Sequence, residues 1–461
     1  MSFDATEPRR NSLMPWDLVD QALAEVQSIS LSGRVVRVSG LVVEGTMPRA
    51  RLGMLCRLMV RGEPEGIPAE VVALKEGSCS LMPLRGISGI TSGTPIEAVE
   101  ELSGVAVSPQ LVGRVLDPWG QPIDGGKRIR AVRRVALQPP PLNPMERGMV
   151  DRPLAMGVSA IDTMLTVGEG QRVVIMAGAG VGKSTLLGML ARSSDADVTI
   201  VAMIGERSRE VKRFVEKELG PKGLARSVVV SATSDTAVAL RLRAAFVATA
   251  LAEYFRDEGK RVLLLMDSLT RVCMAQRELG LATGEPPTTR GYPPSAFAII
   301  PRLLERAGQG TKGGSITAFY TCLLEGDDLG DPIGDAVRAV TDGHVVLSRR
   351  LAERGQFPAI DVLQSTSRVM SDVVGLEHRR AAATVRRLIA DLDEVRELQS
   401  FGAYKPGDVP RFDRALSFEQ ALSDMLTQST ESEGASFEVE RNQLISLARA
   451  VDAAMQGREV T

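Results

Sequence analysis

The sequence AGAGVGKST at residues 177–185 constrains the fold more than any other feature of this chain. It follows the apolar run RVVIM at 172–176 and precedes LLGMLAR, whose apolar residues recur at helical spacing. A strand, a glycine-rich loop and a helix in this order form the context that a phosphate-binding loop requires. The glycines permit backbone conformations closed to other residues, so that successive N–H groups can point at phosphate oxygens. The predicted nucleotide contacts are Ala177, Gly178, Ala179, Gly180, Val181, Gly182, Lys183, Ser184 and Thr185.

Two side chains of this loop predict ATP and Mg²⁺ as ligands. Lys183 would reach the β- and γ-phosphates, and the Ser184 hydroxyl would ligate Mg²⁺ shared with the phosphates. The following helix would present its positive end to the same anion. The strict GxxxxGK[ST] pattern begins with glycine, whereas this loop begins with Ala177. Alanine is tolerable there if the residue keeps an ordinary backbone conformation.

Between about 150 and 375, near-continuous apolar runs alternate with helical patterns. Such runs are typical of strands buried on both faces of a mostly parallel sheet, so the sequence predicts an α/β nucleotide-binding core. The predicted strands lie at 172–176, 198–204, 227–232, 261–267, 315–324 and 344–348.

Two of these strands end in acidic residues. The run RVLLLMD ends at Asp267, whose carboxylate would hold Mg²⁺ from the side opposite Ser184. The run VTIVAMI is followed by Gly205, Glu206 and Arg207, and a carboxylate beside the γ-phosphate can orient and polarise the attacking water. Glu206 is therefore the candidate general base.

The flanking regions predict smaller domains. Short β-rich runs with glycine and proline punctuation predict a small β-barrel over 29–108, and residues 1–28 predict an amphipathic helix that docks a partner or caps its own domain. The ATPase domain is expected over 109–375, with the proline-rich stretch 138–150 as a stiff linker inside it. Helical periodicity without strands predicts a helical domain over 376–461.

Composition excludes several other classes. Lys plus Arg is 55 and Asp plus Glu is 57, so the protein as a whole has no excess of positive charge that would attract nucleic acid. With only His344 and His378 and four widely spaced cysteines, we expect no histidine-based metal cluster, zinc site or disulfide framework, and we expect the cysteines to be free thiols. No apolar run approaches the roughly 20 residues of a membrane span, and MSFDATEPRR does not have the pattern of a secretory signal, which predicts a cytoplasmic protein.

Several further motifs give the chain a family resemblance over nearly its whole length. They are GRVLDPWGQPIDG, AGAGVGKST, IGERSRE, LLLMDSLTR, AQRELGLATGEPPTTRGYPPSAFAIIPRLLERAG and PAIDVLQSTSR, in this order. The chain resembles the catalytic subunits of rotary F- and V-type ATPases, and more closely the flagellar and virulence type III export ATPases. The resemblance implies a β-barrel, a RecA-like P-loop core and a C-terminal helical domain.

The same resemblance assigns roles by position. Glu206 matches the catalytic glutamate and Arg207 the adjoining phosphate-site arginine. Arg368 matches the arginine finger that reaches the neighbouring subunit's site, where a guanidinium stabilises the charge on the γ-phosphate oxygens. Phe357 matches the aromatic residue that stacks on adenine, and Tyr404 is a weaker candidate for the same pocket.

The amino-acid sequences of two segments favour the export ATPases over the ATP synthases. The phosphate loop starts with Ala177, as in export ATPases. The sequence CMAQRELGL is more similar to the flagellar enzymes, although Val272 and Cys273 differ from the residues expected there. The resemblance places the segment 324–332, with Glu325, Asp327, Asp328 and Asp331, at the pore of a homohexamer, where an acidic loop could contact a coiled-coil stalk or cargo or simply be solvated.

The predicted activity is therefore ATP hydrolysis that energises flagellar protein export. The expected partners are a stator-like regulatory protein at the N-terminal helix, a coiled-coil stalk in the pore, an export gate and chaperone–substrate complexes, at the inner membrane periphery. Alternatives are a virulence type III secretion ATPase, an ATP synthase-type catalytic subunit, an RNA-translocating hexameric helicase and a noncatalytic regulatory subunit. Only 4% of residues are aromatic, which disfavours the helicase, and Glu206 disfavours the noncatalytic subunit.

Overall fold

The computed structural model describes residues 31–99, 104–324, 326, 328, 330–430 and 434–455. The chain divides into two compact units, residues 1–100 and 101–461. The predicted partner-binding helix at 1–28 and the acidic residues Glu325 and Asp327 lie outside the described residues.

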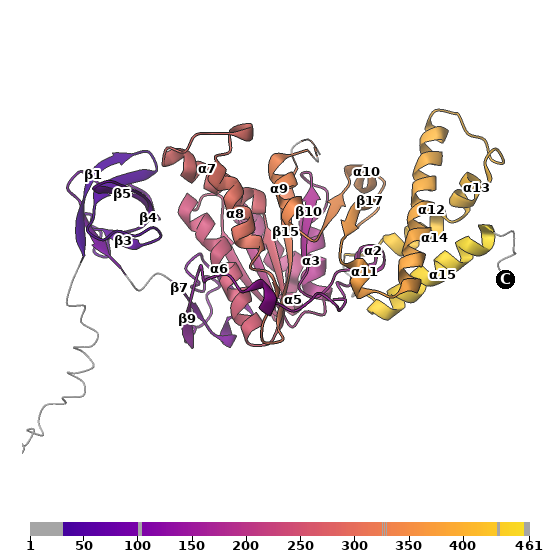
Figure 1. The fold of residues 1–461 in the computed structure, drawn as a ribbon, viewed down its shortest axis with the longest axis horizontal. Helices are drawn as coiled ribbons and strands as arrows, with labels where there is room; N and C mark the ends of the chain where they lie inside the picture. The colour runs from indigo at the N-terminus through magenta and orange to yellow at the C-terminus, as the bar shows by residue number, and fades with distance from the viewer. Residues whose placement is uncertain are drawn as a thin grey trace, which may run out of the picture. The chain divides into compact units, whose positions relative to one another are not determined.

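The first unit contains a closed antiparallel barrel with strand order β1-β2-β5-β4-β3-β6 (Figure 1). In β4, buried and partly exposed residues alternate, because successive side chains of a strand point to opposite faces. Val43, Val71, Leu58 and Leu81 fill the interior. The strands are β1 (Ser32–Ser39), β2 (Val42–Thr46), β3 (Leu55–Leu58), β4 (Ile67–Lys75), β5 (Ser78–Pro83) and β6 (Pro95–Ala98).

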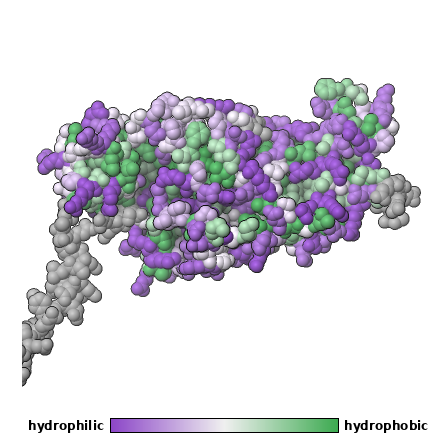
Figure 2. All heavy atoms as spheres, in the orientation of Figure 1, coloured by the Kyte–Doolittle hydropathy of each residue, from purple (hydrophilic) through white to green (hydrophobic). Residues whose placement is uncertain are grey.

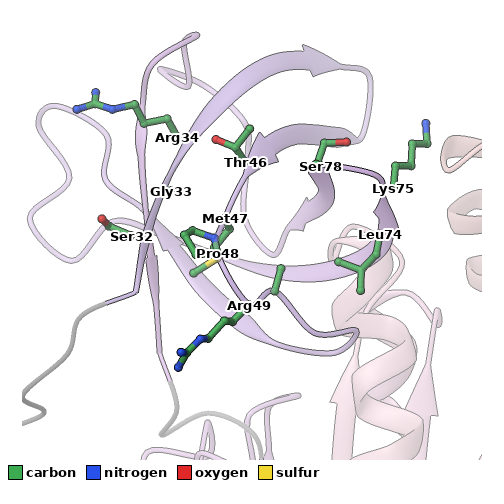
Figure 3. Close-up of a pocket in the computed structure, with 12 residues that line it drawn as sticks. Ser32, Gly33, Arg34, Thr46, Met47, Pro48, Arg49, Leu74, Lys75 and Ser78 are labelled. Atoms are coloured by element: carbon green, nitrogen blue, oxygen red, sulfur yellow. The ribbon is translucent and has the colours of Figure 1, made fainter.

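The barrel carries a shallow hollow of about 680 Å³ on its own surface. Arg34, Arg49 and Lys75 line this hollow, but Figure 3 shows their side chains pointing in different directions. Because the three cations do not converge on one point, the hollow does not form an anion site.

The sequence predicts the barrel over 29–108, but its last strand, β6, ends at Ala98. The next strand, β7 (Gly104–Val107), pairs with β9 (Arg133–Ala136) in a separate two-stranded sheet of the second unit. The apolar run GVAV therefore forms a strand, as its composition indicates, but its hydrogen-bonding partner comes from later in the chain.

The second unit is built on a nine-stranded sheet. Eight of the strands follow one another in the order β17-β16-β10-β15-β13-β11-β12-β8, and β14 pairs with β15 outside this order. All pairs in that order are parallel except β16 with β17. The predicted RecA-like core is confirmed, and each predicted apolar run forms a strand. The strands are β8 (Arg114–Leu116), β10 (Arg172–Ala177), β11 (Val198–Ile204), β12 (Ser227–Ala232), β13 (Arg261–Asp267), β14 (Gly308–Gln309), β15 (Ser315–Leu323), β16 (Gly343–Leu347) and β17 (Ile360–Ser367).

Helices cover both faces of this sheet, which explains why its strands are apolar on both sides. On one face, Val173 and Ile175 of β10 belong to the same core as Leu186 and Leu190 of α3 (Lys183–Ser193). On the other face, α6 (Val238–Asp257) packs on β11, β12 and β13, next to α7 (Leu269–Ala282) and α8 (Pro294–Leu304) (Figure 1). The helix α9 (Pro332–Val340) also lies on this second face, against Met176.

Shorter helices connect these elements. They are η2 (Pro109–Leu111), η3 (Pro144–Glu146), α2 (Ser159–Met164), α4 (Ser208–Arg213), the π-helical turn η4 (Phe214–Leu219), α5 (Gly220–Leu224), η5 (Thr289–Gly291), α10 (Arg349–Glu353) and α11 (Met370–Val373). The proline-rich stretch around η3 is held against the core, because Arg147 donates to the Ala307 carbonyl at 3.1 Å.

The predicted C-terminal helical domain is confirmed. The 25-residue helix α12 (Leu376–Ser400) and α15 (Phe437–Met455) pack against each other, and α13 (Pro410–Ser417) and α14 (Glu419–Leu426) lie beside them (Figure 1). Val385, Leu388 and Leu444 are buried in a core that continues into the sheet domain through α2.

None of the described helices is long and apolar enough to cross a membrane. The face in Figure 2 is mostly polar, with scattered apolar patches. Cys56, Cys79, Cys273 and Cys322 are all buried free thiols, as the sequence predicts.

The barrel interior generates a stability prediction. Leu58 is 0% exposed, so Leu58→Ala should cost about 2–5 kcal/mol through lost burial and the cavity left behind. Leu52→Ala is the matched control, because Leu52 is 66% exposed and its loss should change stability by less than about 0.5 kcal/mol. Hydrogen exchange of peptides from β3 and β4 should accelerate strongly in the first variant only, and equal exchange in both would contradict this account of the barrel core.

Candidate active site

The phosphate loop joins the end of β10 to the start of α3. Gly180 and Gly182 have φ values of 78° and 96°, which side chains rarely adopt, and a Cβ atom added to Gly180 would meet no atom within 4 Å. The loop therefore leaves open space beside its backbone. Ala177 is buried as the last residue of β10 and keeps an extended conformation, which alanine adopts without strain.

Lys183 stands between two carboxylates at the carboxyl edge of the sheet. Its Nζ lies 2.6 Å from Asp267 Oδ1 and 3.7 Å from Glu206 Oε1. Asp267 ends β13 and Glu206 follows β11, which is the neighbouring strand. Parallel strands end at the same edge, so residues far apart in the sequence meet here. The three side chains predicted from separate motifs therefore form one cluster.

Burial sets the electrostatics of the cluster. Asp267 has a side chain only 1% exposed, and its Oδ1 also accepts a hydrogen bond from Thr321 Oγ1 at 2.8 Å. For Glu206, burial chiefly, and then the negative charge of Asp267, raise the pKa to about 7, although the ammonium of Lys183 acts in the opposite direction. A carboxyl group poised near neutral pH can accept a proton at the pH of the cell.

The loop and cluster together fit a magnesium–nucleotide complex. Ser184 lies in the first turn of α3 and is exposed, with Thr185 beside it partly exposed. The described residues contain no group of three or more His, Cys, Asp or Glu that could hold a metal ion by themselves. Mg²⁺ commonly takes one or two protein oxygens and completes its coordination with phosphates and water.

Phe357 lies beside the phosphate loop. A cavity of about 260 Å³ is lined by Phe357, Gly182, Thr185 and Thr430, among others, and the Phe357 side chain is 41% exposed. An exposed aromatic face next to the loop is suited to stacking on a base.

Tyr404 has different surroundings. Its hydroxyl donates to Asp413, its ring packs edge-on against Phe412 at 5.8 Å, and it is not among the residues that line the cavity beside Phe357. The position of Tyr404 thus gives no support to an adenine contact.

Arg207 is not part of the buried cluster. It caps α4, its side chain is 76% exposed, and its guanidinium lies 3.8 Å from Glu210. Its charge is available at the surface next to Glu206.

Arg368 lies at the opposite edge of the sheet from the phosphate loop of its own chain. Its N–H donates to the Asp342 carbonyl, and the Asp342 N–H donates to Arg172, the first residue of β10. The loop begins after Ala177, so about 17 Å of strand separates the two positions at roughly 3.3 Å per residue. An arginine side chain cannot span that distance, and the guanidinium of Arg368 instead donates to the carbonyls of Arg338 and Thr341.

The described part of the acidic loop is paired within the chain. Arg290 lies 3.1 Å from Asp328 and 3.3 Å from Asp331. Asp331 also accepts from the N–H groups of Ile333 and Gly334 and so caps α9. Asp331 therefore has a structural role besides its charge.

The sequence interpretation missed two residues of the site. Thr321 holds Asp267 from β15, and Arg349, the first residue of α10, donates to the Ala179 carbonyl in the loop at 3.2 Å. A threonine within a buried strand gives no periodic signal. Arg349 comes two residues after the end of β16, the neighbour of β10, and an arginine just beyond a strand end could have been identified by that position.

Comparisons with known proteins agree with this architecture. The ATP synthase alpha/beta family models match at residues 35–100 for the β-barrel domain and 157–367 for the nucleotide-binding domain, and the T3SS EscN ATPase C-terminal domain matches at 374–446.

The sequence relatives include the flagellum-specific ATP synthase of Bacillus subtilis, 48% identical over 87% of this chain and 91% of the relative. The type 3 secretion system ATPase of Sinorhizobium fredii is 49% identical over 88% and 90% of the two chains. Among solved structures, the assembled ATPase EscN of the enteropathogenic E. coli type III secretion system superposes with a TM-score of 0.84 at 43% identity, covering 90% of this chain and all of that one. On these grounds the chain belongs to the family of flagellum-specific ATP synthases and type 3 secretion system ATPases.

Proposed function

We propose that this protein hydrolyses ATP to drive protein export through a flagellar type III apparatus. The observation that carries the proposal is the cluster of Lys183, Glu206 and Asp267 at the carboxyl edge of the sheet, beside the phosphate loop. An ATPase is what the family implies. The flagellar assignment rests on the flagellum-specific relatives and on the residues of the motifs. Virulence secretion is the second candidate, because its ATPases are equally similar to this chain in sequence.

In the proposed reaction, the loop binds the phosphates through its N–H groups, and the N-terminus of α3 adds positive potential. The Lys183 ammonium, which pairs with Asp267 in this structure, would turn towards the β- and γ-phosphate oxygens. Ser184 and Asp267 would hold Mg²⁺, which would neutralise charge on those oxygens.

Glu206 would accept a proton from the attacking water as the terminal P–O bond breaks. The Asp267 side chain is nearly inaccessible and is fixed by Thr321, so it is suited to hold a metal but poorly placed to reach water. The Glu206 side chain is 13% exposed and has the raised pKa that a base needs. Arg207, exposed beside it, would contact the phosphate of bound nucleotide.

The position of Arg368 supports action across a subunit interface. Because its own loop lies at the far edge of the sheet, a finger role requires the loop of a neighbouring copy. An arginine finger contributes about 10³–10⁵ in rate, or roughly 4–7 kcal/mol. Hydrolysis would then depend on assembly, and we propose a homohexamer; the structural relative EscN was solved as an assembled ATPase.

The remaining partners follow from relatives and the predicted domains. EscN was also solved with its central stalk EscO, and we propose a comparable coiled-coil stalk for this protein. A stator-like protein at the N-terminal helix, an export gate and chaperone–substrate complexes complete the proposed apparatus, at the cytoplasmic periphery of the inner membrane.

The base role of Glu206 predicts a specific kinetic defect. Glu206→Gln should bind MgATP with nearly unchanged affinity but lose about 10²–10⁴ in turnover, because the amide cannot accept the proton. The wild-type kcat/KM should rise with pH through about 7, because Glu206 is protonated below that value. Steady-state rates and nucleotide titrations at several pH values measure both effects.

Glu216→Gln is the matched control, since Glu216 is an exposed carboxylate that pairs only with Lys212 among the described residues. A Glu206→Gln enzyme that retains substantial turnover with the wild-type pH profile would remove the base assignment.

The interface role of Arg368 predicts complementation between two inactive variants. Lys183→Ala and Arg368→Ala should each lower turnover by at least 10³-fold. Mixed assemblies should regain activity, because some interfaces then join an intact loop to an intact arginine. The measurement is ATPase rate against mixing ratio, and mixtures no more active than the separate variants would contradict action across the interface.

The export role predicts a cellular phenotype. Replacing the chromosomal gene by the Lys183→Ala variant should abolish motility and the appearance of flagellar filament protein outside the cell, while the variant accumulates normally. Normal flagella with loss of another type III secretion activity would instead support the second candidate.

A further inference from the structure

The short segment 427–430, which follows α14 in the helical domain, reaches the cavity beside Phe357. Thr430 lines this cavity together with Phe357 and with Gly182 and Thr185 of the phosphate loop. Two residues earlier, the Gln428 N–H donates to the Phe357 carbonyl at 2.8 Å. A segment of the helical domain therefore holds the backbone of the candidate base-stacking residue.

The side chain of Gln428 is fixed at a different place, the start of α2. Its Nε2 donates to the Gly157 carbonyl at 2.9 Å, and its Oε1 accepts from the Ser159 N–H at 3.2 Å. Both ends of the amide are thus bonded to backbone groups, which defines its orientation as well as its position. The one residue joins the start of α2, through its side chain, to Phe357, through its backbone.

The start of α2 is itself held firmly. Asp162 is 0% exposed, and its two carboxylate oxygens accept from the N–H groups of Met156 and Gly157, each at 2.8 Å. The Ser159 hydroxyl donates to Glu440 of α15. Buried hydrogen bonds of this kind are costly to leave unmade, so this stretch of backbone is a rigid anchor.

The same segment is also tied to the helix that follows the phosphate loop. Arg192, in the last turn of α3, donates to the Thr430 carbonyl at 2.5 Å. The segment is therefore fixed both to α2 and to α3. This arrangement sets the distance between Phe357 and the loop that would bind the phosphates.

Phe357 needs such support because packing covers only part of its side chain, which is 41% exposed. The direction of a partly exposed ring depends strongly on the backbone that carries it. A hydrogen bond to the Phe357 carbonyl fixes the peptide plane next to its Cα atom, and so restricts where the ring can point.

We propose that Gln428 is a positioning residue for the adenine base of the nucleotide. Its side-chain amide anchors the segment, and its N–H holds Phe357 in the orientation that stacks on the base. The inference rests on the proposed stacking role of Phe357. Gln428 contacts no reacting atom, so it should affect binding of the base and leave the chemistry at the γ-phosphate unchanged.

Titrations of the full chain with MgADP and with magnesium pyrophosphate test this proposal, because both ligands carry a diphosphate but only ADP has a base. Gln428→Ala removes the amide and keeps the backbone N–H. The Kd for MgADP should rise about five-fold or more, because two hydrogen bonds that anchor the segment are lost, while the Kd for pyrophosphate stays unchanged. With ATP, KM should rise and kcat should stay within about two-fold of the wild-type value.

Gln420→Ala is the matched control, since Gln420 is an exposed glutamine of α14 whose amide donates to Asp424 of the same helix. It should leave both Kd values unchanged. Phe357→Ala should weaken MgADP alone, and adding Gln428→Ala to it should cause little further loss, because the residue to be positioned is absent.

Equal weakening of MgADP and pyrophosphate by Gln428→Ala would indicate a general structural defect and overturn the proposal, and so would unchanged affinity for both. A loss of MgADP affinity with Phe357→Ala but not with Gln428→Ala overturns this inference alone. Unchanged MgADP affinity with Phe357→Ala removes the stacking role in the proposed function, and this inference with it.

Discussion

The ion pair between Lys183 and Asp267 is the interaction on which the site depends. Its ammonium and carboxylate are 2.6 Å apart and come from positions separated by 84 residues. They meet because β10 and β13 are parallel and both flank β15, so their carboxyl ends lie at one edge. A buried ion pair of this kind contributes little net stability, because desolvation offsets most of the Coulomb attraction. Its presence at the mouth of the loop is better explained by chemistry than by stability.

The cluster also carries one more negative charge than positive when both carboxyl groups are ionised. Burial, together with the charge of Asp267, raises the pKa of Glu206, and we propose that Mg²⁺ supplies the missing positive charge when nucleotide binds. Lys183 could then turn from Asp267 to the phosphates without leaving the buried Asp267 carboxylate unpaired. The site in this structure and the proposed nucleotide-bound site would thus differ by an exchange of cations around Asp267 rather than by a rearrangement of the sheet.

The sequence predicted the sheet and the centre of the site well, for a physical reason. Strands buried on both faces must be continuously apolar, so the runs at β10, β11, β13 and β15 are visible without any knowledge of their neighbours. Residues that follow the ends of such strands lie at the same edge of the sheet, and in the structure Lys183, Glu206 and Asp267 lie together there. Pairing partners are non-local, however, so the sequence did not show that β7 joins β9 rather than the barrel, or that β17 runs antiparallel. Single polar contacts such as Thr321 and Arg349 depend on that same non-local geometry, and the local setting of Tyr404 against Asp413 is not visible from its motif.

The central proposal is that nucleotide lies at an interface between two copies of the chain, bound by the loop of one and completed by the arginine of the other. The most direct measurement is a structure of the assembled protein with MgADP and fluoroaluminate as a mimic of the transferred phosphoryl group. The account predicts the Arg368 guanidinium of one subunit within hydrogen-bond reach of the mimic held by Lys183 of the next. A complete site in which Arg368 still donates to Arg338 and Thr341, remote from every nucleotide in the assembly, would contradict it.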